Sequence, residues 1–121
     1  MVYSHNMRVS LSRLCRLYPP REILEAFGMS VGLSMECAPV GYQEEGARTP
    51  AYHKRRVAEL TRHVMDGGHL DPISIIGHED KNLPIELTDG HHRLLACWYA
   101  GLQTIEVRYR GPKSTLNKIR S

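Results

Sequence analysis

The pentapeptide Asp89-Gly90-His91-His92-Arg93 connects a strand pattern to a helix pattern without an intervening loop. Residues 85–88 alternate apolar and polar side chains, as a half-buried strand does, whereas residues 94–100 are almost continuously apolar, as in a helix buried on more than one side. Aspartate is a preferred N-cap residue, and glycine allows a close backbone approach. We therefore expect Asp89 to cap the helix and Gly90 to bring the backbone close to a ligand.

The first turn of this helix is a candidate anion-binding site. The first backbone N–H groups of a helix have no partner within it and lie at the positive end of the helix dipole, where a phosphate or carboxylate is stabilised. Arg93, together with His91 and His92 when protonated, adds positive charge that the dipole opposes, and a bound anion would reverse that unfavourable interaction. The alternative is an ordinary Asp-Gly turn with Arg93 extended into water.

Helix and strand signals follow one another in a regular order on both sides of the pentapeptide. Thr49-Pro50 is a cap followed by proline at the first helical position, and apolar residues then recur every three or four positions up to Gly67. Strand patterns follow over residues 71–76 and, after Gly101 ends the central helix, over residues 104–110. This order predicts an α+β fold, a small mixed sheet with packed helices in a single domain, residues 1–121. We further expect a short strand near residues 7–11 followed by a turn, a short helix over 21–27, and a short helix or frayed end over 113–121.

Residues 52–110 resemble the ParB/sulfiredoxin-like superfamily in this order of elements and in the Asp-Gly-His-His-Arg sequence at the start of the central helix. The resemblance implies that this loop binds the phosphates of a nucleotide, through Gly90, His91, His92 and Arg93. The Arg93 fork would hold two phosphate oxygens at once. Sulfiredoxins carry a cysteine where His91 stands, so the resemblance does not imply sulfinic acid repair, and the pentapeptide is more similar to that of the free serine kinases of the same fold.

Hydrolysis of a phosphate ester would require further groups around the phosphate. Besides capping the helix, Asp89 could hold a magnesium ion or take a proton. His91 and His92 point about 100° apart on a helix, so they cannot chelate one metal, but one could act as general acid while the other packs. Glu36 is our candidate for the carboxylate that orients the attacking group, with Glu22 or Glu25 on the short helix as alternatives. Each of these three acids also has an ordinary explanation as a solvated side chain.

The composition limits the range of partners. The 121 residues carry a net charge of +3 and a sequence pI of about 8.9, which permits nucleic acid binding without requiring it. Cys15, Cys37 and Cys97 contain no Cys-x-x-Cys pair, which argues against a disulfide framework and a structural zinc site and favours a reducing compartment. No apolar run approaches the roughly 18 residues of a membrane span, so we expect a cytoplasmic protein without membrane contact.

These observations lead to competing hypotheses about function. The first is an enzyme that hydrolyses a phosphate ester, an NTPase or nuclease, with ATP or another nucleotide as ligand and magnesium as cofactor. The alternatives are a non-catalytic, nucleotide-gated module that binds DNA or a protein partner, a small-molecule kinase of the same fold, and a small adaptor protein. Residues 29–48 show no periodicity, and we expect them to form a mobile cover over the site.

Overall fold

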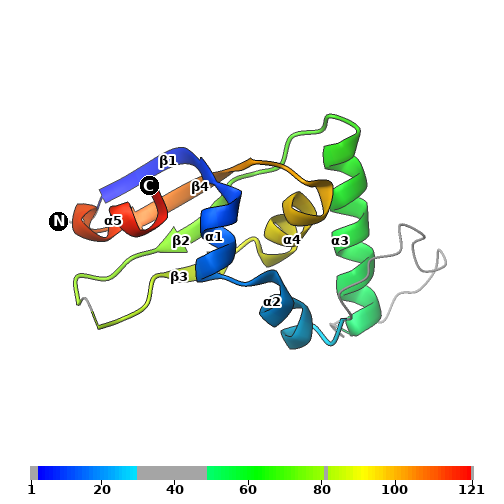
Figure 1. Ribbon diagram of the computed structural model, residues 1–121, viewed down its shortest axis with the longest axis horizontal. Coiled ribbons are helices and arrows are strands. Elements are labelled where there is room, and N and C mark those ends of the chain that lie inside the picture. Colours follow the sequence, from blue (N-terminus) through cyan, green and yellow to red (C-terminus); the bar gives the residue numbers. More distant parts are fainter. Residues whose placement is uncertain (1–2, 30–48, 81, 121) are drawn as a thin grey trace.

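The computed structural model of the chain describes residues 3–29, 49–80 and 82–120. The fold is mixed α+β, as predicted, with a four-stranded sheet and helices packed on it (Figure 1). The elements are β1 (Tyr3–Ser10), α1 (Leu11–Leu17), α2 (Pro20–Ala26), α3 (Pro50–Met65), β2 (Ile73–Ile76), β3 (Glu86–Asp89), α4 (His91–Ala100), β4 (Thr104–Gly111) and α5 (Lys113–Arg120).

The strand order in the sheet is β1-β4-β2-β3. β1 and β4 form an antiparallel ribbon of eight residue pairs, from Tyr3 opposite Gly111 to Ser10 opposite Thr104. The shorter β2 runs parallel to β4 on its other side, and β3 pairs antiparallel with β2. The parallel neighbours β2 and β4 are connected through β3 and α4, since parallel strands need a long crossover connection.

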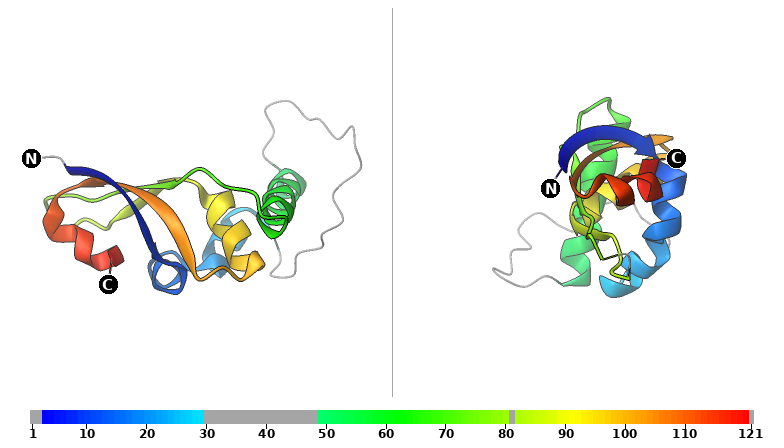
Figure 2. Two further views of the ribbon diagram at one scale, coloured as in Figure 1. Left: turned by 90° about the horizontal axis from the view of Figure 1, so that it is seen from above. Right: turned by 90° about the vertical axis from the view of Figure 1, so that its left-hand side faces the viewer.

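One face of the sheet carries the main hydrophobic core. Along β4, Ile105, Val107 and Tyr109 are buried and alternate with outward side chains, so the strand has one apolar and one polar face. Helices α1, α4 and α5 contribute buried leucine, cysteine and isoleucine side chains to the same core. Figure 2 shows these helices on one side of the strands.

A second, smaller cluster lies between the helices. Leu24 of α2, Val57 of α3 and Leu95 of α4 are fully buried against one another, with Trp98 partly buried beside them. Because α4 also contributes Leu94 to the sheet core, it is buried on more than one side, which confirms the interpretation of its sequence.

The sequence correctly predicted helices α2 and α3. Pro20 begins α2, and the Thr49 hydroxyl accepts a hydrogen bond of 3.2 Å from the backbone N–H of Tyr52 in the first turn of α3. The turn expected after the first strand was wrong, because residues 11–17 form helix α1 instead. Ser10 caps α1 through its hydroxyl, and Leu11 and Leu14 bury the same side of it.

The C-terminal residues form helix α5, which is anchored to the sheet through buried Leu116 and Ile119. At its start, the Tyr109 hydroxyl donates a hydrogen bond of 2.6 Å to the Pro112 carbonyl and also contacts the Thr115 hydroxyl. Among the described residues, no helix is both long and apolar enough to cross a membrane.

Candidate functional site

The start of α4 differs from the prediction in its cap. Asp89 is the last residue of β3, and Gly90 is the N-cap, with a φ of 104° and no side chain to accept a hydrogen bond. The prediction that Asp89 caps the helix was therefore wrong. The reason is the pairing of Asp89 with Ser74 of β2, which keeps Asp89 in the sheet and leaves the change of direction to the next residue.

Gly90 is required by the packing of the protein itself. A Cβ atom at this position would lie 2.5 Å from Cγ2 and 2.8 Å from Cβ of Ile73 at the start of β2, and the positive φ is unfavourable for any other residue. We expected Gly90 to bring the backbone close to a ligand, but it brings the backbone close to β2 instead. As a result, the first turn of α4 is held directly against the sheet and receives no side-chain cap from Gly90.

Arg93 is bound by groups of the protein on one side of α4. Its Nη1 donates to the backbone carbonyls of Asp71 (3.1 Å) and Pro72 (2.8 Å), and its Nη2 lies 3.0 Å from Oδ2 of Asp89. Its side chain is 21% exposed, whereas that of Asp89 is 71% exposed. Arg93 therefore holds the segment before β2 onto α4, and its contact with phosphate stays a prediction.

His91 points to a different side, into a groove of about 310 Å³ between α2, β3 and α4. Burial lowers the pKa of His91, and the nearby Asp89 carboxylate offsets part of that effect. Burial therefore disfavours the protonated form of His91, in which it would add positive charge to the first turn. Most of the groove lining is apolar: Leu17, Tyr18, Pro19, Ile23, Ala26, Phe27 and Leu87, with Glu22 as the acidic residue.

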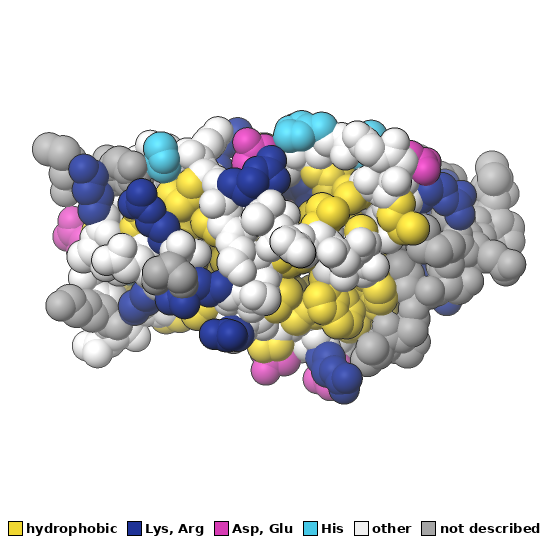
Figure 3. All heavy atoms as spheres, turned by 45° about the horizontal axis from the view of Figure 1, so that its top comes forward, with side chains coloured by type: hydrophobic (Ala, Val, Ile, Leu, Met, Phe, Trp, Pro, Cys, Tyr) yellow, Lys and Arg dark blue, Asp and Glu magenta, His cyan; other side chains and the backbone are white. Residues whose placement is uncertain are grey.

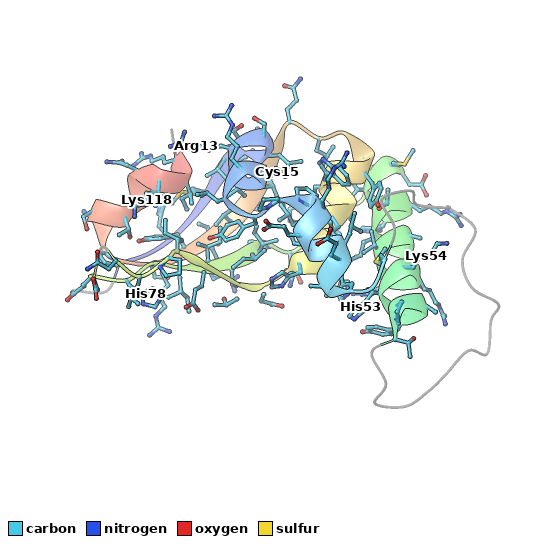
Figure 4. All side chains as sticks on the ribbon, turned by 60° about the horizontal axis from the view of Figure 1, so that its bottom comes forward. Arg13, Cys15, His53, Lys54, His78 and Lys118 are labelled. Atoms are coloured by element: carbon cyan, nitrogen blue, oxygen red, sulfur yellow. The ribbon has the colours of Figure 1, made fainter. Side chains whose placement is uncertain are left out.

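His92 belongs to an aromatic cluster that joins α2, α3 and α4. Its Nε2 lies 2.7 Å from Nδ1 of His53, within hydrogen-bond distance, and the ring of Phe27 stacks on both histidines at centroid distances of 4.8 Å and 3.9 Å. Tyr52 packs edge-on against the same pair. Figure 4 shows His53 on the inner side of α3, with the neighbouring Lys54 on the outer side.

Sequence reasoning missed His53. The available signal was its spacing: His53, Val57 and Thr61 are four residues apart, so they lie on one face of α3, and all three are buried. A histidine on the buried face of a helix needs a polar partner, and His92 supplies one here.

The remaining predicted site residues differ in where they lie. Glu36 lies outside the described residues, as does most of the expected cover over residues 29–48. Glu22 lines the groove, whereas Glu25 is exposed on α2 without lining it. Within the described parts of the chain, no three His, Cys, Asp or Glu side chains are grouped as a metal cage. The assignment of Asp89 as a magnesium ligand stays a prediction, and in the structure its carboxylate forms an ion pair with Arg93.

The three side chains of the motif thus diverge into three surroundings. His91 lines the groove, His92 lies in the aromatic cluster, and Arg93 contacts the segment before β2, as expected for successive residues about 100° apart on a helix. The chemical capacity of the site rests on the backbone N–H groups of the first turn, the imidazole of His91 and the apolar groove beside them. That combination suits a ligand with one flat apolar part and one anionic part.

No protein-family model, curated protein or solved structure matches the chain. The relationship to the ParB/sulfiredoxin-like superfamily therefore rests on the order of elements and the Asp-Gly-His-His-Arg sequence, and it stays a prediction.

Proposed function

We propose that this protein binds a nucleotide, with the base and sugar in the groove between α2 and α4 and the phosphates at the first turn of α4. The observation that carries the proposal is the position of His91, which is the first residue of α4 and also lines the groove. A ligand in the groove would therefore be next to backbone N–H groups at the positive end of the α4 dipole. The resemblance of the pentapeptide to a nucleotide-binding motif supports the same assignment.

The groove offers a fixed apolar surface for a base. The Tyr18 ring is held by a hydrogen bond of 2.8 Å from its hydroxyl to the Ile85 carbonyl, and Phe27 is held by stacking against the two histidines of the aromatic cluster. Rings fixed in this way lose little conformational entropy when a ligand binds. They favour a planar ligand over a flexible one.

A second candidate function, hydrolysis of the bound nucleotide, is supported by the lowered pKa of His91. A neutral imidazole can accept a proton from an attacking water molecule or hydroxyl group, which a protonated one cannot do. Magnesium, if the reaction uses it, would be held by the phosphates together with the Asp89 carboxylate and would neutralise charge on the phosphates.

The proposal can be tested by filling the groove. Ala26 lines the groove and is exposed, so Ala26→Trp should occupy the volume of the base without disturbing the core. Calorimetric titration of the parent with ATP, GTP, CTP and UTP, with and without magnesium, should give binding by at least one nucleotide. We expect Ala26→Trp to weaken that binding about tenfold or more, since the base could no longer bury its apolar surface in the groove. The matched control is Ala51→Trp, an equal change on the exposed surface of α3, which should leave affinity unchanged.

The same samples separate binding from catalysis. Release of phosphate by the parent and its loss in His91→Asn, with nucleotide affinity retained, would support hydrolysis. Binding without product would support a non-catalytic module. Absence of binding by any of the four nucleotides in the parent, or equal weakening by Ala26→Trp and Ala51→Trp, would contradict the proposed groove.

A further inference from the structure

A second cavity lies away from the groove, between α4, the start of β4 and the segment that joins α3 to β2. Its volume is about 220 Å³, and it shares no lining residue with the groove. That volume lies below the roughly 300–1,000 Å³ of sites for drug-sized ligands, so an occupant has to be small. The cavity is lined by both charged and hydrophobic side chains, which limits the chemistry of that occupant further.

The cavity arises because the segment before β2 stands apart from the start of β4. β4 pairs with β1 from Thr104 onward, whereas its pairing with β2 begins only at Val107, opposite Ile73. In Figure 1 this segment is the green stretch between the end of α3 and β2. Arg93 of α4 holds the segment through two of its backbone carbonyls, with donor–acceptor distances of 3.1 and 2.8 Å. The cavity is therefore maintained by hydrogen bonds of the fold.

Arg8 lines this cavity and forms no ion pair with another described residue. Glu106 lies directly opposite Arg8 in the pairing of β1 with β4, but its Oε2 lies 3.5 Å from Nε2 of His69. Arg8 instead donates a hydrogen bond of 3.3 Å to the hydroxyl of Thr104, which is neutral. Burial raises the pKa of the Cys97 thiol in the cavity wall to about 11, and the nearby Arg8 charge opposes part of that rise. The positive charge of Arg8 therefore reaches the buried wall of the cavity.

Hydrophobic side chains form another part of the wall. They are Val64, Leu70, Cys97, Leu102 and Ile105. Leu102 is 41% exposed, so a ligand in the cavity would remove apolar surface from water. In Figure 3, Lys and Arg side chains gather toward the left-hand end of the molecule, whereas hydrophobic side chains reach the surface toward its middle and right. The cavity lies where these regions meet, since β1 and β4 line it on one side and α3 and α4 on the other.

We infer that this cavity binds a small carboxylic acid with an aliphatic chain, in its ionised form. The carboxylate would pair with Arg8, because a planar guanidinium group can hold two carboxylate oxygens at once. The chain would lie against the hydrophobic part of the wall, which includes Leu70, Leu102 and Ile105. The ion pair would fix the position of the head group, and the burial of methylene groups would supply the affinity.

The acidic side chains of the cavity restrict the kind of anion. Asp71 and Glu106 also line it, and they repel a ligand that carries more than one negative charge. Arg93, the second cation of the wall, is already paired with Asp89, so Arg8 is left to bind a single carboxylate. A monocarboxylate is therefore favoured over a phosphate dianion or a dicarboxylate. The inference is independent of the nucleotide site, because the cavity and the groove have no lining residue in common.

The test is a titration of isotope-labelled protein with acetate, butanoate and hexanoate, followed by amide NMR spectra. The backbone signals of Leu70, Leu102 and Thr104 should shift and reach saturation, because these residues line the cavity. Affinity should rise about fourfold for each added methylene group that becomes buried. Hexanol, which has a chain of the same length without the charge, should bind the parent more weakly than hexanoate.

The variant that tests the ion pair is Arg8→Gln, which keeps a polar side chain next to Thr104 but removes the charge. It should weaken the binding of hexanoate about tenfold or more, through loss of the charge-assisted hydrogen bonds, and leave the binding of hexanol unchanged. The matched control is Arg108→Gln, which removes the same charge from an exposed arginine of β4 that does not line the cavity. It should weaken the binding of hexanoate less than about threefold, through the long-range field alone.

Several results would overturn the inference. Equal weakening by Arg8→Gln and Arg108→Gln would show an effect of net charge without contact in the cavity. Equal loss of hexanoate and hexanol binding in Arg8→Gln would show a changed cavity and no ion pair. Tighter binding of hexylammonium than of hexanoate would exclude a carboxylate as the ligand, as would failure of the parent to bind hexanoate. Ala26→Trp should leave the affinity for hexanoate unchanged, so failure of the nucleotide proposal and failure of this one give different results.

Discussion

At each end of β2, a glycine with a positive φ packs closely against the backbone of the strand or its neighbour, but the surroundings of the two glycines differ. At its start, Gly90 with a φ of 104° packs on Ile73, and at its end, Gly111 with a φ of 151° packs on Gly77, where an added Cβ would lie 2.7 Å from the carbonyl oxygen. Each glycine is followed directly or after one residue by a helix, α4 or α5. Glycine therefore sets the approach of both helices to the sheet.

The polar groups at the two junctions have different partners. Beside Gly111, the hydroxyls of Tyr109 and Thr115 and the carbonyl of Pro112 bond to one another inside the protein. Beside Gly90, the first turn of α4 has no side-chain cap at its N-cap position, and His91 lines an open groove. The polar groups beside Gly111 are thus bonded to one another within the protein, whereas the N-cap residue of α4 has no side chain and His91 lines the groove in which we propose that a ligand binds.

The largest expected effect tests the close packing of a glycine, which the two junctions share. Gly90→Ala and Gly111→Ala should each lower the free energy of unfolding by about 2–5 kcal/mol, from backbone strain together with crowding against β2 or Gly77. Urea unfolding followed by circular dichroism measures this. Gly101→Ala is the control, because Gly101 has a φ of 73° but no atom within 4 Å of the added Cβ, so only strain remains. If all three variants lose the same stability, close packing is not the reason for glycine at the junctions.

The next effect tests whether the contacts of Arg93 with the protein stabilise the fold. Arg93→Ala should destabilise the protein by about 1.5–3 kcal/mol, because it removes the charged donor to the Asp71 and Pro72 carbonyls and the ion pair with Asp89. Arg108→Ala is the control, since Arg108 is exposed and forms no ion pair with another described residue, and it should change stability by less than about 0.5 kcal/mol. An unchanged melting temperature in Arg93→Ala would contradict a stabilising role for these contacts.

The smallest expected effect is the pH dependence of stability that arises from His91, at the junction beside Gly90. Burial lowers the pKa of His91 in the folded protein, so the unfolded chain binds more protons in the interval from about 6.5 down to the folded value. Stability should therefore fall as the pH falls below about 6.5. Melting temperatures at pH 7.5 and 5.5 should differ less in His91→Asn than in the parent. An equal difference in both proteins would contradict burial of the imidazole.

Local signals explain which elements the sequence predicted well. Thr49 with Pro50 marked the start of α3, Pro20 the start of α2 and Gly101 the end of α4, and each acts through its own backbone or its nearest neighbours. Helix α1 was missed because it has only seven residues, so the spacing from Leu11 to Leu14 also fitted a loosely alternating strand.

The geometry of the site was less predictable because it depends on contacts between distant residues. The N-cap of α4 is Gly90 and not the predicted Asp89, because Asp89 pairs with β2, and the residues of α4 do not encode that pairing. Arg93 bonds to carbonyls about twenty residues earlier, and His92 to a histidine 39 residues earlier. The spread of the motif into three directions was predictable from helix geometry, but the identity of each partner was not.

The ribbon of β1 and β4 also has a consequence for how the chain folds. Arg8 and Thr104, which touch across it, are 96 residues apart in sequence, so the outer strand can pair only after nearly all of the intervening chain has been synthesised. Until then β1 has no partner strand, and its apolar residues and backbone hydrogen-bonding groups are exposed to other chains. Long-range pairing of this kind slows folding and increases the risk of aggregation. We therefore expect the yield of refolding to fall as the protein concentration rises.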